Sequence, residues 1–224
     1  EFQRIKGSSI VPAPAVASLY YVRSVILVSM VPLWKVKTVA CDNGSRTSVA
    51  LTKIIFDEFY HIRPDFRPAA PNLAEMLANN DAALLIGDNA LKFMEINERP
   101  DIEKQKSMVR LGSEPLEVFD LAERWRFLTG LPFVFAFWAV REGFKENGIV
   151  DTLKGSRDFG VSNIPEIAQK YGEQLQIKKE FVQDYLEKNV HYYMDHACLE
   201  ALQLFYEKAA RVGAIKSVRG LQFI

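Results

Sequence analysis

Residues 38–59 read TVACDNGSRTSVALTKIIFDEF, and the character of the chain changes within this stretch. Its start belongs to the segment 35–40, which predicts a buried strand, and its end predicts an amphipathic helix over 47–60. Between them, residues 42–48 are small or charged and fill a core poorly. A polar turn between two buried elements is a candidate binding site. The apolar face of the predicted helix carries Leu51, Ile54, Ile55 and Phe59.

Strands and helices alternate on both sides of this stretch. The runs VRSVILVS (22–29), AALLIGD (82–88) and LPFVFAFWAV (131–140) predict buried strands. Helices are predicted from Asn72, which opens a capping box, and over 115–129. Such alternation favours an α/β fold with a mainly parallel sheet covered by helices.

The last third of the chain has a different pattern. From about residue 147 to the end the sequence predicts four helices and no strand. Asp195 is predicted to cap the last of them, which ends at Gly213. These helices have no sheet of their own, so we expect them to pack on a sheet built from earlier residues.

Basic and acidic residues balance, with 28 of each among 224, so no global field favours nucleic acid or an anionic membrane as a partner. Local groups must therefore bind any anion. Cys41 and Cys198 form no C-x-x-C motif and are expected to be reduced and structural. No apolar run is long enough to span a bilayer, and the first residues lack the apolar segment of a signal peptide, so a cytoplasmic location is expected.

The polar turn has the chemistry of an anion site. In an open α/β sheet, ligands bind outside the carboxyl ends of the strands, where the next helix presents unpaired amides. The hydroxyls of Ser45, Thr47 and Ser48 could donate beside those amides. Arg46 could pair with a carboxylate, and Gly44 would let the backbone approach it. The alternative is a capped helix without a ligand, in which Ser45 is the cap and Arg46 lies in solvent. The turn lacks the P-loop pattern, so a small carboxylate suits it better than a nucleotide.

Four segments together resemble one family. VRSVILVS, TVACDNGSRTSVAL, AALLIGDNAL and TGLPFVFAFWAVR occur in the order and spacing of the chorismate dehydratases of the futalosine pathway of menaquinone biosynthesis. The resemblance runs from about the first residue to the last. It implies a cytoplasmic protein with a two-lobe α/β fold like that of type II periplasmic binding proteins, in which two crossing strands join the lobes and the ligand lies between them.

The resemblance also implies a division of the chain. The strands 22–29 and 133–140 would cross side by side. Residues 1–29 and 133–224 would form the first lobe, and residues 30–132 would form the second, an α/β lobe. The family's first lobe opens with at least two further βα units, on the order of sixty residues, that have no counterpart in this sequence. The resemblance therefore implies an incomplete first lobe.

The family reaction removes water from the ring of chorismate and yields 3-[(1-carboxyvinyl)oxy]benzoate, so the resemblance implies a hydro-lyase. Aromatisation supplies the driving force, so no metal, nicotinamide or nucleotide cofactor is needed. The protein mainly orients a dianion and manages two protons. The expected partner is a small-molecule substrate, chorismate, and neither nucleic acid nor a membrane.

Seven residues are candidates for substrate binding: Ser18, Ser24, Ser45, Arg46, Thr47, Ser48 and Asp88. Ser18 and Ser24 flank the first predicted crossing strand, where ordinary solvated serines are equally expected. Asp88 follows a buried strand and either reaches the ligand or only forms a turn. Phe133 and Phe135 either line the cleft or pack in a core.

The sequence identifies no general base. His61, His191 and His196 have no metal-binding spacing and are expected to face solvent. The enolpyruvyl carboxylate of the substrate could accept the proton instead. The alternative function is a non-catalytic two-lobe binding protein for a small aromatic carboxylate.

Overall fold

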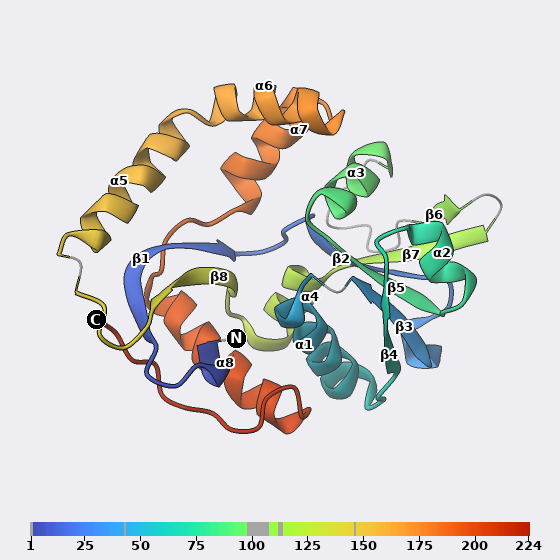
Figure 1. The fold of residues 1–224 in the computed structure, drawn as a ribbon. Coiled ribbons are helices and arrows are strands. Elements are labelled where there is room, and N and C mark those ends of the chain that lie inside the picture. Colours follow the sequence, from blue (N-terminus) through green and yellow to red (C-terminus); the bar gives the residue numbers. More distant parts are fainter. Residues whose placement is uncertain (1, 43, 98–107, 112–113, 146) are drawn as a thin grey trace. The chain divides into compact units, whose positions relative to one another are not determined.

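The chain folds into two units, which are described separately (Figure 1). Unit 1 contains residues 1–20 and 129–224, and unit 2 contains residues 21–128. Unit 2 is therefore one continuous segment inserted between the two parts of unit 1. The computed structural model describes residues 2–42, 44–97, 108–111, 114–145 and 147–224.

Unit 2 is built on a mixed sheet whose described strands are β2 (Val25–Ser29), β3 (Thr38–Asp42), β4 (Asp65–Ala69), β5 (Ala82–Ile86), β6 (Met108–Leu111) and β7 (Glu114–Asp120). Their order across the sheet is β4-β3-β5-β2-β7-β6. β3 is parallel to β4 and β5, whereas β2 is antiparallel to β5 and β7. Every residue of β2 is buried, as expected for a central strand with both faces covered.

The described helices of unit 2 are α1 (Arg46–Ile55), α2 (Leu73–Ala78), α3 (Gly87–Asn97) and α4 (Leu121–Thr129). α1 buries Leu51, Ile54 and Ile55, as the sequence predicted. It continues as a π-helical turn, Phe56–Tyr60, and this wider turn shifts the apolar face. Phe56 is fully buried, while Phe59 is 39% exposed, so the predicted place of Phe59 on the buried face is wrong.

The segment 115–129, predicted as one helix, is a strand followed by a helix. β7 pairs with β2 on one edge and with β6 on the other, and α4 begins only at Leu121. Pairing along both edges outweighs the local helix signals, which are a proline at the predicted first helical position, Pro115, and the helix former Glu117. Similarly, the strand predicted over 82–88 ends at Ile86, because Gly87 already begins α3.

Unit 1 contains an antiparallel pair, β1 (Ser9–Ser18) and β8 (Phe133–Val140), which lie side by side in Figure 1. Phe133 is 1% exposed and packs edge-on against Phe135 and Phe205, at ring-centroid distances of 4.8 and 5.1 Å. Phe133 is therefore a core residue of unit 1. The described helices that follow, as predicted beyond residue 147, are α5 (Ile149–Ser162), α6 (Ile164–Leu175), α7 (Lys179–Asp184) and α8 (His196–Arg211).

The two strands expected to cross side by side lie in different sheets. β2, within 22–29, pairs with β5 and β7 in unit 2, whereas β8 pairs with β1 in unit 1. The predicted pairing is wrong, and so is the assignment of 22–29 to the first lobe. An all-apolar strand has the same pattern at the centre of a sheet as at a junction of lobes, so burial alone misled the prediction. The division between the units falls at 20–21 and at 128–129.

Both cysteines are free and buried, Cys41 in β3 and Cys198 in α8. Burial raises the pKa of the Cys41 thiol to about 11 and that of the Cys198 thiol to about 12. Both side chains are therefore neutral thiols near pH 7, in keeping with the structural role predicted for them. Across the described ranges, no helix is both long and apolar enough to cross a membrane.

Candidate functional site

Strands β3, β5 and β7 of unit 2 end at the same edge of the sheet. β3 is parallel to β5, and β7 runs in the direction of β5 because both are antiparallel to β2. Each of the three strands leads into a helix, α1, α3 and α4 respectively. Three helix N-termini, with their unpaired amides and positive dipole ends, therefore lie along one edge. We call this the carboxyl edge, and it comprises residues 22–24, 42, 44–48, 86–88 and 120–123.

Ser45 caps α1, as the sequence analysis expected. Its backbone is extended, and its Oγ accepts the Ser48 amide at 3.1 Å. The two hydroxyl oxygens, Ser45 Oγ and Ser48 Oγ, lie 2.8 Å apart, and Ser48 is only 2% exposed. The backbone amide and the hydroxyl of Ser48 are thus both directed at the Ser45 hydroxyl. Ser45 and Ser48 first of all build the start of the helix.

Thr47 and Arg46 occupy the first turn of α1 and are more accessible than Ser48. Thr47 is half-buried and Arg46 is exposed. Their amides belong to the turn whose N–H groups have no acceptor within the helix. Among the four candidate residues of the turn, Thr47 offers a hydroxyl and an amide together at the mouth of the helix.

The turn already contains one carboxylate. The Gly44 amide donates to Asp42 Oδ1 at 2.9 Å. A Cβ at position 44 would lie 3.3 Å from Asp42 Oδ1 and 3.5 Å from Ile86 Cδ1, so a glycine lets the turn fold closely onto the end of β5. A ligand carboxylate bound here would share the turn with Asp42. Arg46 and the dipole of α1 would have to offset that negative charge.

Two further predicted residues, Ser24 and Asp88, lie on the same edge. Ser24 is 7% exposed and precedes β2, and its carbonyl accepts the Gly87 amide at 2.7 Å. Asp88 is exposed in the first turn of α3, so it begins a helix rather than the turn expected for it. Ser18 ends β1 in unit 1, where it is 1% exposed and pairs with Phe133. The structure thus brings together all the candidates in unit 2, while Ser18 belongs to the other unit.

Asp120 is a residue of the carboxyl edge that the sequence analysis missed. This carboxylate is 3% exposed. Oδ2 accepts the amides of Val22 and Arg23 at 2.9 and 2.6 Å. Oδ1 accepts the amides of Ala122 and Glu123 at 3.0 and 3.1 Å. Asp120 therefore occupies the N-terminus of α4. Of the three helices that begin on this edge, α1 and α3 remain as those whose N-termini could bind an anionic ligand. The bonds to Ala122 and Glu123 follow the local pattern of a helix N-cap, whereas no local pattern indicates the bonds to Val22 and Arg23, 98 and 97 residues away.

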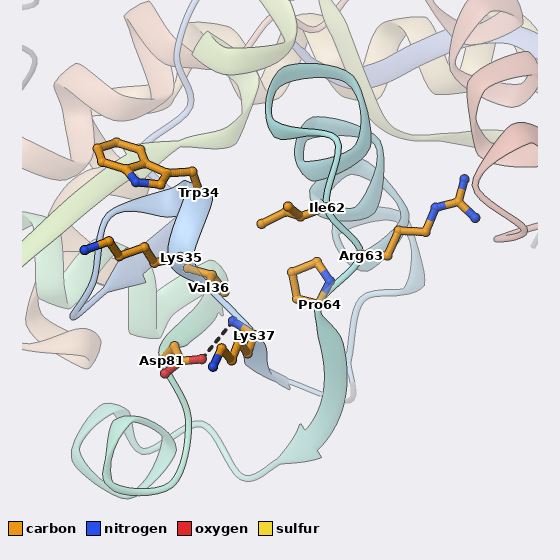
Figure 2. A pocket seen from close by; sticks show the side chains of 8 residues that line it. All are labelled: Trp34, Lys35, Val36, Lys37, Ile62, Arg63, Pro64 and Asp81. Carbon is orange, nitrogen blue, oxygen red and sulfur yellow. Dashed lines mark hydrogen bonds between the residues drawn. The ribbon is translucent and has the colours of Figure 1, made fainter.

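A surface pocket of about 720 Å³ lies at the opposite edge of the sheet (Figure 2). It is formed where β3, β4 and β5 begin, and Asp81 Oδ2 accepts the amides of Lys37 and Thr38 there at 2.8 and 3.0 Å. Ligands of open α/β sheets bind at the carboxyl ends of strands, so we take the carboxyl edge as the candidate site. The pocket is lined by Trp34, Lys35, Val36, Lys37, Ile62, Arg63, Pro64 and Asp81.

The histidines only partly meet the prediction that they face solvent. His61 and His196 are exposed, and His61 adopts a left-handed conformation at the end of the π-helical turn. The side chain of His191 is 18% exposed and lies 2.9 Å from an oxygen of Asp195. Together with Cys198 these two residues form a cluster in unit 1 that the sequence analysis did not anticipate.

Comparison with known proteins identifies a relative by sequence and a solved structure that resembles this chain. A chorismate dehydratase of Thermus thermophilus is 33% identical over 204 residues, which cover 88% of this chain and 72% of that protein. Among solved structures, a candidate nitrate transport protein of Thermoplasma volcanium is 10% identical, with a TM-score of 0.49 over 95% of this chain and 75% of that one.

The family comparison covers most of the chain. The family model described as menaquinone biosynthesis matches residues 6–211. The match includes β1 to β8 and all of the helices α1 to α8, and therefore the whole carboxyl edge. The resemblance stated from the sequence motifs is confirmed at this level: the chain belongs to the menaquinone biosynthesis family.

Proposed function

We propose that this protein is a chorismate dehydratase, a hydro-lyase that converts chorismate to 3-[(1-carboxyvinyl)oxy]benzoate. The observation that carries the proposal is the 33% identity over 204 residues to a chorismate dehydratase. The carboxyl edge of unit 2 supports it independently, because the edge has the chemistry that a carboxylate substrate requires. The substrate is a small dianion, and the helix N-termini there favour negative charge.

In the proposed reaction, the ring carbon that bears the ether gives up its proton to an acceptor, and the neighbouring hydroxyl takes up a proton and leaves as water. The electrons of the broken C–H bond form the new ring double bond, and the ring becomes aromatic. Aromatisation makes the step favourable, so the protein must chiefly hold the two carboxylates in one orientation. We assign this task to the first turn of α1, with Thr47 and Arg46 as the side chains that contact a carboxylate.

The proton needs an acceptor. Of the carboxylates described on this edge, Asp42 is bonded to the Gly44 amide and Asp120 to four backbone amides, Glu123 is buried, and Asp88 is exposed at the start of α3. We therefore propose that the enolpyruvyl carboxylate of the substrate accepts the proton. An analogue that lacks this carboxylate should bind weakly and fail to aromatise even at saturating concentration. Normal turnover of that analogue would contradict the assignment.

The test of the function is direct. Purified full chain is incubated with chorismate, and the aromatic product is separated and quantified against a control without protein. Thr47→Val should lower the affinity for a benzoate-like dicarboxylate about ten- to a hundred-fold, because a hydrogen bond to a charged group is lost. Thr52→Val is the matched control. Thr52 lies on the same helix, fully buried, with its Oγ1 bonded to the Ser48 carbonyl at 2.8 Å, so it affects stability and not the edge.

The alternative is a binding protein that holds a small aromatic carboxylate without changing it. The hydrogen bonds of Asp42 and Asp120 favour it, because both carboxylates already accept backbone amides. The same experiment separates the two functions. Saturable binding of chorismate with no aromatic product supports the binding protein, and product formation supports the dehydratase.

A further inference from the structure

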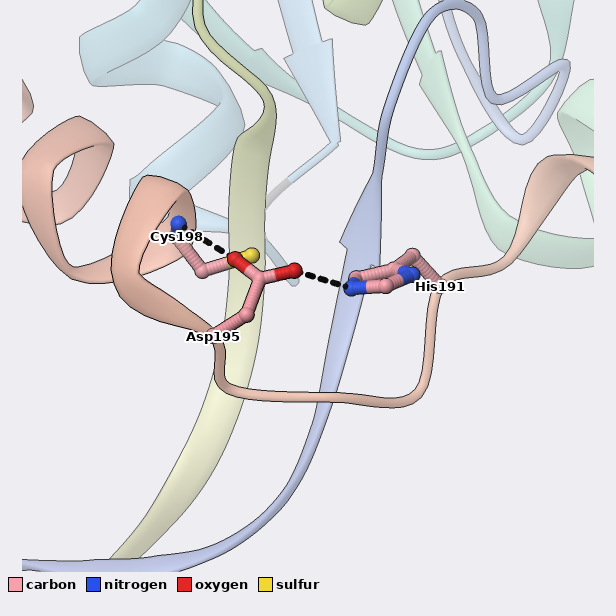
Figure 3. Close-up of side chains that lie close together, drawn as sticks. All are labelled: His191, Asp195 and Cys198. Atoms are coloured by element: carbon pink, nitrogen blue, oxygen red, sulfur yellow. Dashed lines mark hydrogen bonds and ion pairs between the residues drawn. The ribbon is translucent and has the colours of Figure 1, made fainter.

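Three residues of unit 1 bring different metal-binding atoms together (Figure 3). A ring nitrogen of His191, a carboxylate oxygen of Asp195 and the Sγ of Cys198 all lie within 4.8 Å of one another. The chain has only three histidines and two cysteines, and one of each meets here. Nitrogen, oxygen and sulfur are the three ligand types that zinc uses in proteins.

The backbone holds all three residues in place. His191 forms a β-bridge with Ala17, in which each amide donates to the carbonyl of the other residue, at 2.8 and 2.9 Å. Asp195 is the N-cap of α8, and its Oδ1 accepts the Cys198 amide at 2.9 Å. Cys198 lies on the first turn of the same helix. Side chains that project from such fixed backbone can bind an ion with little rearrangement.

The spacing of the donor atoms suits one ion. Zinc bonds of about 2.0–2.3 Å in a tetrahedral arrangement place neighbouring donors about 3.3–3.8 Å apart. His191 Nε2 and Asp195 Oδ2 are 2.9 Å apart, and no pair in the cluster exceeds 4.8 Å. An ion between them requires shifts of less than about 1 Å. The cap bond of Asp195 uses Oδ1, so Oδ2 can leave His191 for a metal without uncapping the helix.

The cluster is accessible from one side. Cys198 is fully buried and forms its floor, whereas the side chains of His191 and Asp195 are 18% and 44% exposed. A metal ion can therefore reach the three donors from solvent, and water can supply a fourth ligand. The positive end of the α8 dipole opposes a cation, and the charges of Asp195 and of a metal-bound thiolate offset it.

We propose that His191, Asp195 and Cys198 form a structural site for zinc or a divalent ion of similar preference. The ion would join the segment that pairs with β1 to the start of α8 and so stabilise unit 1. The proposal concerns unit 1 alone and does not depend on the dehydratase function proposed for unit 2. Its success or failure is therefore separate from that of the enzyme assay.

The test uses the reduced, metal-free full chain without an affinity tag that binds metal. Cobalt(II) should bind with one-to-one stoichiometry and give a thiolate-to-cobalt charge-transfer band in the near ultraviolet, which zinc then removes. Cys198→Ala should abolish the band. Cys41→Ala is the matched control, because it removes the other buried thiol, and the band should persist.

Two variants at accessible positions keep the test decisive if Cys198→Ala folds poorly. His191→Gln should weaken zinc binding at least about 10- to 100-fold, because losing even a residue that only hydrogen-bonds to a metal ligand costs that much. Asp195→Asn keeps a good helix cap and should also weaken it. Zinc should raise the melting temperature of the unaltered chain and raise it less in these variants. Absence of the band in the unaltered chain, its persistence in Cys198→Ala, or equal zinc affinity in His191→Gln would overturn the proposal.

Discussion

The buried carboxylate of Asp120 accepts the backbone amide of Arg23 at 2.6 Å, across 97 positions of sequence. Arg23 has a φ of +61°, which is uncommon for a residue with a side chain. The same carboxylate accepts the Val22 amide and two amides of the first turn of α4. One side chain therefore joins the segment that begins unit 2 to the helix that ends it.

Asp120→Ala should lower the free energy of unfolding by about 3–5 kcal/mol, because it leaves four backbone amides, three of them buried, without their acceptor. Chemical denaturation followed by circular dichroism measures the change. Asp65→Ala is the control: Asp65 is exposed and pairs with Arg67 on the surface, so that variant should stay within about 0.5 kcal/mol of the unaltered chain. A loss below about 1 kcal/mol for Asp120→Ala would show that water or a neighbour replaces the carboxylate.

Ser45 allows the helix cap to be separated from ligand binding. Aspartate and asparagine are both good N-caps, so Ser45→Asp and Ser45→Asn should each keep stability within about 0.5 kcal/mol, whereas Ser45→Ala should lose about 1 kcal/mol. Only Ser45→Asp adds a negative charge beside Asp42. If the turn binds a carboxylate, that variant should bind a benzoate-like dicarboxylate at least about ten-fold more weakly than Ser45→Asn does. Calorimetric titration of both variants measures this, and equal affinities would mean that the turn is a capped helix and no binding site.

Local signals in the sequence predicted the helix starts well. Ser45, Asn72 and Asp195 each cap a helix by accepting an amide three residues on, and such a contact depends only on its own turn. Strand partners were not predictable in the same way. The apolar runs of β2 and β8 look alike, yet β2 is central in one sheet and β8 belongs to another. That difference comes from residues far along the chain.

The residues of the candidate site also divide into those that have a local signal in the sequence and those that depend on distant residues. The turn at 42–48 could be recognised because polar residues interrupt two buried elements, and Ser24 and Asp88 follow from their places beside strands. Asp120 was not recognised, because its segment was predicted as one helix and two of its four partners, Val22 and Arg23, are distant in sequence. The cluster of His191, Asp195 and Cys198 was also missed, since nothing in the sequence indicates that Ala17 holds His191 beside the start of α8.

The aromatic core of unit 1 should be sensitive to the loss of one ring. Phe133→Ala removes a fully buried ring that packs against Phe135 and Phe205, and it should cost about 3–5 kcal/mol of unfolding free energy. Phe159→Ala is the control, because Phe159 is 72% exposed on α5 and should cost less than about 0.5 kcal/mol. Denaturation of both variants under the same conditions checks this. Similar losses in the two would mean that Phe133 is not a core residue.

The Cys41 thiol should make stability fall at alkaline pH. Burial raises its pKa from 9.0 to about 11, so the folded protein favours the neutral thiol. Below pH 9 both folded and unfolded chains carry the thiol, and its contribution is fully present. Between pH 9 and about 11 the unfolded chain ionises first, so stability is lost progressively across this window. Cys41→Ala should therefore show a shallower fall than the unaltered chain across this window, measured as denaturation midpoint against pH.

Val39→Ala, which removes fully buried volume from the same strand but no titrating group, should run parallel to the unaltered chain. A Cys41→Ala curve that also runs parallel would mean that Cys41 ionises as readily in the folded protein as in the unfolded chain.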